Sequence, residues 1–222
     1  MRRLHILCEG QTEETVVRET LGPHFTVPGK VCVTYSVLKT KRSASGQASR
    51  GGVSTWPKIR TDLRNLLRDS SITVLTTMID YYGVPDDTPG MVDCPTGTPW
   101  ERVAHVERAV GTAVGDPRFL PHFVLHETES WVLACDEVLE LVTGDPKLPE
   151  EVRTVVAEAG GPELVDGGRD TAPSKRLERL YPGYRKTSDG PDAIALAGLA
   201  HIRTRCPHTD RWLAAVEARL NG

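Results

Sequence analysis

Apolar residues form four short runs that are typical of β-strands. The runs cover residues 3–8, 31–38, 72–80 and 122–127. The third is rich in β-branched residues and lies between the polar segments RDSS and YYGVPDD, which favour turns. The fourth, like the first, is only six residues long, and it is preceded by a proline. The pattern predicts four strands, each short enough to be buried in one sheet.

Between these runs, apolar residues recur every three or four positions, as expected on one face of a helix. The sets are Val16, Val17, Thr20 and Leu21; Ile59, Leu63, Leu66 and Leu67; and Val103, Val106, Val110 and Val114. Further helical patterns cover residues 128–141, 149–159, 173–181, 192–202 and 209–220. Strands that alternate with helices are typical of parallel βαβ units. We therefore predict an α/β fold with a parallel sheet flanked by helices.

The alternation stops after residue 130, and the rest of the chain is mostly helical. A chain of 222 residues is long enough to build one substantial core without a second full domain. We expect an α/β domain at residues 1–130 and a helical C-terminal extension at residues 131–222, packed on the same core.

Acidic residues stand at the ends of three predicted strands. Glu9 ends the first strand and Glu13 follows in the first helix, Asp80 ends the third strand, and Glu127 and Glu129 follow the fourth. In parallel sheets, polar sites gather beyond the carboxyl ends of the strands, so these side chains should converge there. Clustered carboxylates repel one another unless a cation or a proton joins them, and hard oxygen ligands suit Mg²⁺ or Mn²⁺.

Each acid also has a structural interpretation. Glu13 and Glu129 stand in first turns, where the helix dipole favours acids whatever the function, and Asp80 can organise the turn that follows it. Thr12 and Thr128 are expected to cap the helices that follow them. Glu9 is the hardest to explain in this way, because neither capping nor amphipathicity requires a carboxylate at the end of an apolar strand.

Two segments are locally basic. Residues 39–50 carry Lys39, Lys41, Arg42 and Arg50 without any acid. These residues are expected to form either a flexible loop that binds a phosphate backbone or a disordered loop exposed to solvent. In the second segment, Lys175 follows Pro173 in the first turn of a predicted helix, where cations oppose the helix dipole. An anion bound at this helix terminus would resolve the conflict, and a solvated basic face is the alternative.

Composition narrows the class of protein. The net charge of −3 excludes a globally basic nucleic-acid coat but not a local basic groove. No apolar run approaches the length of a membrane span, and the start MRRLHILCEG lacks the pattern of a signal peptide, so we expect a cytoplasmic protein that does not enter a membrane. The five cysteines are scattered and are expected to be reduced thiols.

The chain lacks the sequence motifs of several common catalytic and nucleotide-binding sites. There is no P-loop, no dinucleotide-binding glycine pattern and no G-x-S-x-G, so any ATP hydrolysis would come from a partner. The histidines show no metal-ligand spacing, although His126 differs from the others because it adjoins Glu127.

The segments ILCEGQTEE and TTMIDYYG resemble the Toprim fold, a Rossmann-like domain shared by topoisomerases, DnaG-type primases and OLD-family nucleases. Nearly the whole chain is similar to an uncharacterised bacterial Toprim-like family that is related to the OLD nucleases and often encoded beside an ATPase. The matching features are CEGQTEE, GGVSTWPKIRTDL, MIDYYGVPDD, LHETES, TAPSKRLERLYPGYRK and CPHTDRWL.

This resemblance implies roles for the acids. Glu9 matches the Toprim glutamate, Glu13 a second acidic metal ligand of OLD-like nucleases, and Asp80 the first aspartate of the D-x-D pair. Tyr82 stands where the second aspartate would be, so Glu127 or Glu129 must replace that ligand if the site is active.

The implied function is a Mg²⁺- or Mn²⁺-dependent nuclease that works on DNA or RNA with a partner ATPase, in DNA maintenance or phage defence. In this hypothesis Lys175 steadies the developing negative charge and also contacts phosphate. The alternative is a non-catalytic subunit that binds nucleic acid or a partner protein through a degenerate Toprim site. A primase-like nucleotidyl transferase is a weaker possibility, because no zinc-binding or nucleotide-binding element accompanies the acids.

Overall fold

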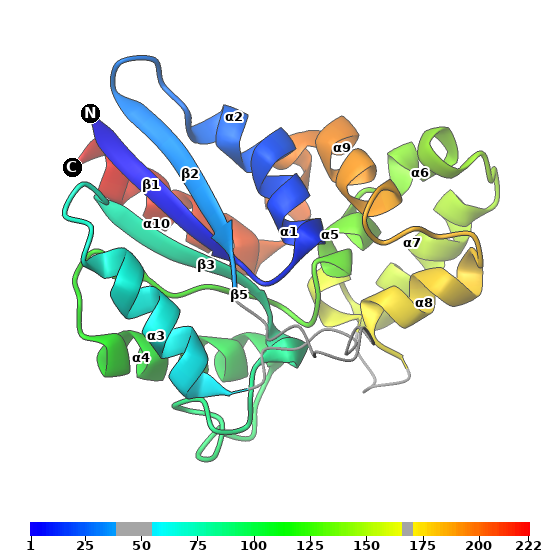
Figure 1. Ribbon diagram of the computed structural model, residues 1–222. Coiled ribbons are helices and arrows are strands. Elements are labelled where there is room, and N and C mark those ends of the chain that lie inside the picture. The colour runs from blue at the N-terminus through cyan, green and yellow to red at the C-terminus, as the bar shows by residue number, and fades with distance from the viewer. Residues whose placement is uncertain (39–54, 166–170) are drawn as a thin grey trace, which may run out of the picture.

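The computed structural model describes residues 1–38, 55–165 and 171–222 and contains a five-stranded parallel sheet. The strands are β1 (Arg2–Cys8), β2 (Val31–Val37), β3 (Val74–Asp80), β4 (Phe119–Leu120) and β5 (Phe123–Val124). Their order is β2-β1-β3-β4, and β5 pairs with β3 farther along the same edge. Figure 1 shows this sheet with helices around it. The predicted α/β class with a parallel sheet flanked by helices is confirmed.

The helices follow the predicted pattern with local differences. They are α1 (Gln11–Val16), α2 (Gly22–Phe25), α3 (Trp56–Leu67), α4 (Pro99–Val114), α5 (Glu129–Ala134), α6 (Asp136–Thr143), α7 (Leu148–Ala159), α8 (Pro173–Leu180), α9 (Asp189–Arg205) and α10 (Pro207–Asn221). Short π- and 3₁₀-helical turns lie at η1 (Val17–Leu21), η2 (Tyr81–Gly83) and η3 (Pro162–Leu164). The described residues after Glu129 are mostly helical, as predicted.

Three local predictions were wrong. The fourth strand, expected at residues 122–127, is only Phe123–Val124, because the chain leaves the sheet directly afterwards. The helix expected at residues 128–141 is two helices that meet at Cys135. The N-cap of α1 is Gly10 rather than Thr12, because the Glu13 side chain accepts the hydrogen bond of the Gly10 N–H at 2.9 Å.

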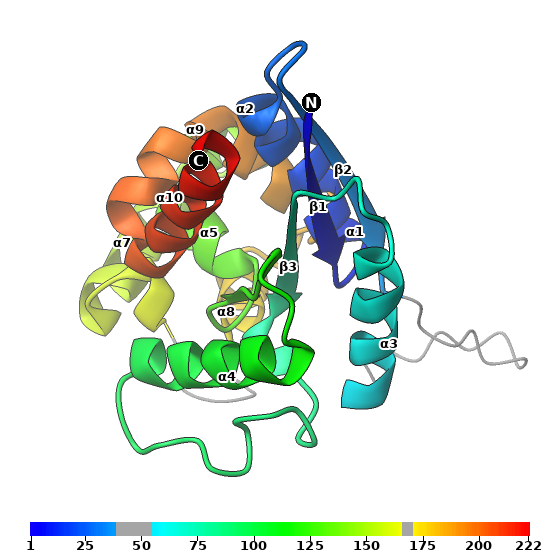
Figure 2. The ribbon, with the colours of Figure 1, turned by 90° about the vertical axis from the view of Figure 1, so that its left-hand side faces the viewer.

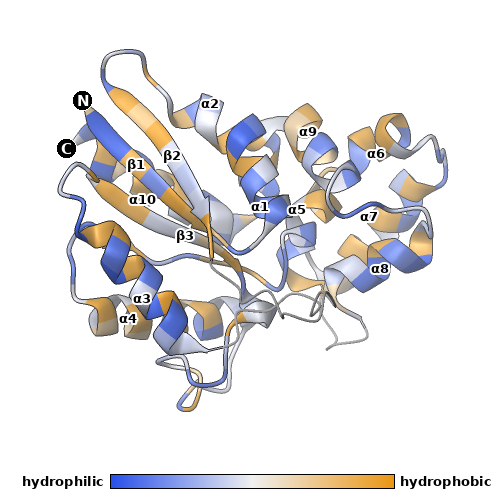
Figure 3. Ribbon diagram, in the orientation of Figure 1, coloured by the Kyte–Doolittle hydropathy of each residue, from blue (hydrophilic) through white to orange (hydrophobic). Residues whose placement is uncertain are grey.

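The sheet separates two hydrophobic layers. Because side chains alternate along a strand, Leu4 and Ile6 of β1 face one layer and Leu7 faces the other. The first layer contains α1, α5, α9 and α10, and the second contains α3 and α4. Figure 2 shows α9 and α10 on one side of the strands and α3 on the other. Figure 3 shows apolar residues along the strands and mixed faces on the helices around them.

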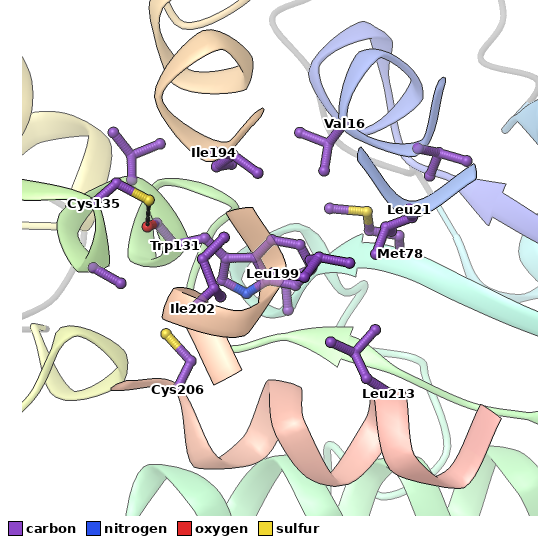
Figure 4. Close-up of a cluster of buried hydrophobic side chains, with 14 of the residues drawn as sticks. Val16, Leu21, Met78, Trp131, Cys135, Ile194, Leu199, Ile202, Cys206 and Leu213 are labelled. Carbon is purple, nitrogen blue, oxygen red and sulfur yellow. Dashed lines mark hydrogen bonds between the residues drawn. The ribbon is translucent and has the colours of Figure 1, made fainter. Parts of the chain in front are cut away.

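Trp131 of α5 lies at the centre of the first layer and is fully buried. Figure 4 shows it among side chains from distant parts of the chain, including Val16, Met78, Ile202 and Leu213. These residues come from α1, β3, α9 and α10, so the sheet and the C-terminal helices share one continuous core. Among the described helices, none combines the length and the apolar content that a membrane crossing needs.

Strand register places the expected site at one edge of the sheet. Cys8 of β1 pairs with Met78 of β3, and the next residue, Glu9, donates its backbone N–H to the Met78 carbonyl at 3.0 Å. Asp80 of β3 pairs in turn with Val124 of β5. The carboxyl ends of β1, β3 and β5 are therefore neighbours, and the polar residues that follow them meet beyond the sheet.

Candidate metal centre

Glu9 lies at the carboxyl end of β1, with its carboxylate turned toward the end of β3. Its Oε2 atom accepts the backbone N–H of Asp80 at 2.9 Å. Gly83 approaches the same carboxylate so closely that a Cβ atom at that position would stand 2.7 Å from both Glu9 oxygens. A glycine is therefore needed at residue 83 for Glu9 to keep this position.

Glu13 serves two purposes at once. Its Oε2 atom caps the start of α1 through Gly10, a structural role in addition to the favourable helix dipole. Its Oε1 atom lies 2.8 Å from the hydroxyl of Thr128, which stands next to the fourth strand end. The side chain is buried, so this carboxylate belongs to the cluster as well as to the helix cap.

Thr128 is the N-cap residue of α5, as expected, but its side chain joins two of the carboxylates instead of bonding to the helix. Its backbone N–H donates to Asp80 Oδ1 at 2.8 Å, and its hydroxyl lies 3.1 Å from the same oxygen and 2.8 Å from Glu13. A hydroxyl has one proton to donate, so it serves only one of the two carboxylates at a time. The second contact is favourable when a proton or a cation neutralises one of the acids.

The segment after β5 turns sharply to bring two more acids into the site. His126 has a φ of 64°, which is unusual for a residue other than glycine, and its Nε2 atom lies 3.1 Å from the carbonyl oxygen of Glu163. Such backbone strain is typical of functional loops. Oxygens of Asp80, Glu127 and Glu129 then lie within 4.8 Å of one another, close enough to share one cation.

The first turn of α8 also points to this cluster. The backbone N–H of Ser174 donates to Glu127 Oε2 at 2.9 Å. The anion at this helix terminus is therefore a carboxylate of the chain itself, which the positive end of the helix dipole stabilises. Whether a phosphate also binds at this terminus stays a prediction.

Lys186, which the sequence patterns did not single out, supplies the nearest cation. It lies in the connection between α8 and α9, and its Nζ atom stands 2.9 Å from Glu129 Oε2 and 3.8 Å from Asp80 Oδ2. Glu129 is fully buried, and neither of its oxygens has a hydrogen-bond partner of standard geometry among the described residues. The ion pair with Lys186 is therefore its main compensation for losing water.

Burial and mutual repulsion change the pKa values of the acids. Burial, together with the charge of Glu13, raises the pKa of Glu9 to about 7. Burial raises the pKa of Glu129 to about 7 against the opposing charge of Lys186. The pKa of Asp80 rises well above its usual value through burial and the charges of Glu13 and Glu9. The acids therefore hold protons in the metal-free protein that a metal ion would release.

Lys186 responds in the opposite direction. Burial would lower its pKa, but the charges of Glu129 and Asp80 outweigh that effect and raise the pKa above its usual value. Lys186 is therefore cationic at every physiological pH. A positive charge is present in the site before any ligand arrives.

The donor set fits a hard divalent cation. Mg²⁺ and Mn²⁺ prefer carboxylate oxygens, and the site offers them from Glu9, Glu13, Asp80, Glu127 and Glu129. Glu129 has buried oxygens that lack standard hydrogen bonds, as expected for a ligand held for a metal. A group of acidic side chains able to hold a metal ion is thus present at this edge of the sheet.

Other predicted site residues lie elsewhere. Lys175 is on the exposed face of α8, with its Nζ atom 2.6 Å from Glu178 Oε2. Tyr82 is 40 % exposed, and its ring centroid lies 5.2 Å from that of His126. Lys39, Lys41, Arg42 and Arg50 fall in residues 39–54, outside the described part of the chain, so their role stays a prediction.

The comparisons with known proteins give one result. The model of a family described as a domain of unknown function, DUF4276, matches residues 8–217, which is nearly the whole chain. The matched span includes all the carboxylates of the site and Lys186. Neither the curated proteins nor the solved structures contain a match.

Proposed function

We propose that this chain, which belongs to the DUF4276 family, is a metal-dependent nuclease that hydrolyses phosphodiester bonds. The observation that supports it is the cluster of carboxylates at three strand ends, with buried oxygens of Glu129 that lack standard hydrogen bonds. A cluster kept only for stability would be costly, because like charges and burial both oppose ionisation. The likeness of these strand ends to the Toprim and OLD nucleases agrees with this function.

In this proposal Asp80, Glu127 and Glu129 hold one Mg²⁺ or Mn²⁺ ion, and Glu9 and Glu13 complete the site from the side of β1. Glu127 and Glu129 would replace the missing second aspartate, because their oxygens and those of Asp80 lie within 4.8 Å of one another. The bound metal would polarise the phosphodiester, lower the pKa of a water molecule and stabilise the leaving oxygen.

Lys186 would change partners during the reaction. In the metal-free protein its ammonium group neutralises Glu129 and Asp80. A divalent cation at the same carboxylates would release Lys186 to contact a phosphate oxygen, where a fixed positive charge stabilises developing negative charge. Lys186 is therefore better placed for this role than Lys175, whose ammonium group lies at the surface beside Glu178.

Thr128 and the first turn of α8 would hold the carboxylates in position. Thr128 contacts Asp80 and Glu13, and Ser174 contacts Glu127, so three acids have partners that fix their orientation. Partners of this kind orient metal ligands. Lys175, with Lys39, Lys41, Arg42 and Arg50, would hold the phosphate backbone away from the metal.

The second candidate function is a non-catalytic subunit that binds nucleic acid or a partner protein. One observation favours it: Lys186 already pairs with Glu129 and Asp80, so part of the cluster is neutralised without metal. The absence of an aspartate at Tyr82 agrees with it. In either case we propose a partner ATPase and a role in DNA maintenance or phage defence.

The test is cleavage of labelled single- and double-stranded DNA and RNA with Mn²⁺, with and without the proposed partner ATPase. We expect cleavage by the wild type, retained binding without cleavage by Asp80→Asn, and strongly reduced cleavage by Lys186→Gln. Lys30→Gln is the matched control, because Lys30 is exposed and belongs to the turn before β2.

A second set of variants separates binding from chemistry. Serine at Lys39, Lys41, Arg42 and Arg50 should weaken binding and reduce its salt dependence, because fewer counterions are released. Cleavage of saturating substrate should be largely retained. Binding without cleavage under every condition would favour the non-catalytic subunit, and no binding at all would refute the nucleic-acid hypothesis.

A further inference from the structure

A second cluster of metal-binding side chains lies apart from the carboxylates described above. Glu107 belongs to α4, His122 precedes β5, and His208 lies in the first turn of α10. One ligand atom from each residue lies within 4.8 Å of the other two. We propose that these three side chains bind a divalent transition-metal ion, Zn²⁺ in the first instance, that ties α10 to α4 and the sheet.

The Glu107 carboxylate faces a ring nitrogen of each histidine. Glu107 Oε1 lies 3.4 Å from His122 Nδ1 and 3.1 Å from His208 Nε2, and Glu107 Oε2 is hydrogen-bonded to His208 Nε2 at 3.3 Å. These contacts are longer than the roughly 2.7–2.9 Å of charge-assisted hydrogen bonds, and a bound metal would replace them. In a tetrahedral zinc site with metal–ligand bonds near 2.0–2.1 Å, neighbouring ligand atoms are about 3.3 Å apart.

The donor chemistry also separates this site from the carboxylate cluster. Two imidazoles and one carboxylate suit Zn²⁺ and other transition metals, whereas Mg²⁺ and Mn²⁺ prefer sites made of oxygen. Three protein ligands leave a fourth position for water or for an added ligand. The two centres should therefore differ in the metal that each prefers.

The surroundings hold the three ligands in place. The His122 ring stacks on the indole of Trp212 at a centroid distance of 4.0 Å and an interplanar angle of 5°. The Phe123 N–H donates to Glu107 Oε1 at 3.0 Å, which orients the carboxylate. His122 and His208 are almost completely buried, and the Glu107 side chain is 17 % exposed, so the metal would enter past Glu107.

The ligands come from three separate segments of the chain, so a bound metal would act as a cross-link. A metal ion that binds only the folded protein stabilises the fold. The gain in stability grows with the logarithm of the ratio of the metal concentration to the dissociation constant of the site. The expected role is to hold α10 against the sheet. This role is independent of whether the carboxylate cluster cleaves phosphodiesters.

The experiment compares Zn²⁺ binding and thermal stability among the metal-stripped wild type, Glu107→Gln and Glu129→Gln. We expect the Glu129→Gln protein, whose carboxylate centre has lost one of its ligands, to keep the Zn²⁺ site at Glu107 and its thermal shift. Glu107→Gln should weaken that site at least about a hundredfold, since even outer partners of metal ligands change affinity by 10–100-fold. It should leave Mn²⁺ binding at the other centre unchanged.

A measurement that does not depend on variants uses Co²⁺ as a probe of geometry. Tetrahedral Co²⁺ with nitrogen ligands absorbs much more strongly in the visible range than octahedral Co²⁺ bound by oxygen. We expect the intense bands in the wild type and in Glu129→Gln. Their absence from both proteins, or Zn²⁺ binding that Glu129→Gln abolishes and Glu107→Gln leaves intact, would overturn the proposal.

Discussion

Replacing Glu9 by glutamine should stabilise the metal-free protein, although it removes a residue of the proposed site. Glutamine keeps the shape of the side chain, and its carbonyl oxygen can still accept the Asp80 N–H that Glu9 accepts at 2.9 Å. What it removes is a negative charge in a buried cluster. The effect of that charge on stability depends on pH in a way that the structure predicts.

The pKa of Glu9 is raised from 4.5 to about 7 in the folded protein, first by burial and then by the charge of Glu13. Below pH 4.5 the Glu9 carboxyl group is protonated in the folded and in the unfolded protein, so it does not lower the stability of the fold. Between these two values the unfolded chain releases the proton first, so the stability of the folded protein decreases as the pH rises. A tenfold change in proton affinity corresponds to about 1.4 kcal/mol, so ionised Glu9 costs about 3 kcal/mol above pH 7.

The Glu9→Gln protein should therefore be more stable than the wild type by up to about 3 kcal/mol at pH 8 and by less than about 1 kcal/mol at pH 5. In a domain of this size such a gain raises the melting temperature by roughly 6–12 °C. Scanning calorimetry of metal-stripped protein at both pH values measures it. The matched control is Glu158→Gln, the same change on the exposed surface of α7, which should have no comparable effect.

Saturating Mn²⁺ completes the experiment. It should stabilise the wild type at pH 8, because the metal binds the ionised carboxylates of the folded state, and it should stabilise Glu9→Gln much less. If Glu9→Gln instead destabilises the metal-free protein by about 1 kcal/mol or more at both pH values, Glu9 is a structural acceptor. The argument from charge repulsion would then be refuted.

Three further variants test the surroundings of the cluster. Lys186→Gln should destabilise the metal-free protein at pH 8 by about 3 kcal/mol, because it leaves buried Glu129 without its counter-ion. Calorimetry should show a smaller loss of stability when Mn²⁺ is present. Gly83→Ala should cost about 1–3 kcal/mol and weaken Mn²⁺ binding in titration calorimetry, because the new methyl group displaces the Glu9 carboxylate. Thr128→Val should destabilise the protein by about 1–3 kcal/mol in urea unfolding and weaken Mn²⁺ binding, because Asp80 and Glu13 lose a hydrogen-bond donor. An unchanged Mn²⁺ affinity in Gly83→Ala or in Thr128→Val would contradict the positioning role of that residue.

The convergence of the acids was predictable because it follows from strand order. Parallel strands end at the same edge of a sheet, so Glu9, Asp80 and the segment at Glu127 had to meet once the strands were recognised. Glu13 has a structural use and a place beside the other acids, since one oxygen accepts the Gly10 N–H at the start of α1 and the other contacts Thr128, and its role as a metal ligand stays a prediction. No sequence pattern distinguishes these two uses of a single carboxylate.

Residues that reach their partners through tertiary packing could not be predicted. Lys186 lies between helices, and nothing in its local sequence shows that this connection folds back over Glu129. Lys175 had the stronger pattern, a cation in the first turn of a helix, but its side chain turns to Glu178 on the next turn. His122 and His208 lack metal-ligand spacing because the ligands are far apart in the sequence, and they meet only when α10 packs beside the sheet.

The shared core around Trp131 has a consequence for synthesis on the ribosome. The first strand, β1, is made before α9 and α10, which belong to the layer that covers one face of its sheet. Because pairing and packing between distant segments are slow to form, we expect this part of the nascent chain to remain open until α9 and α10 emerge. We therefore expect the acids of the cluster to take their final positions only after these helices have packed. Such a protein should depend on chaperones that hold the exposed strands, and removal of α10 should direct it to degradation.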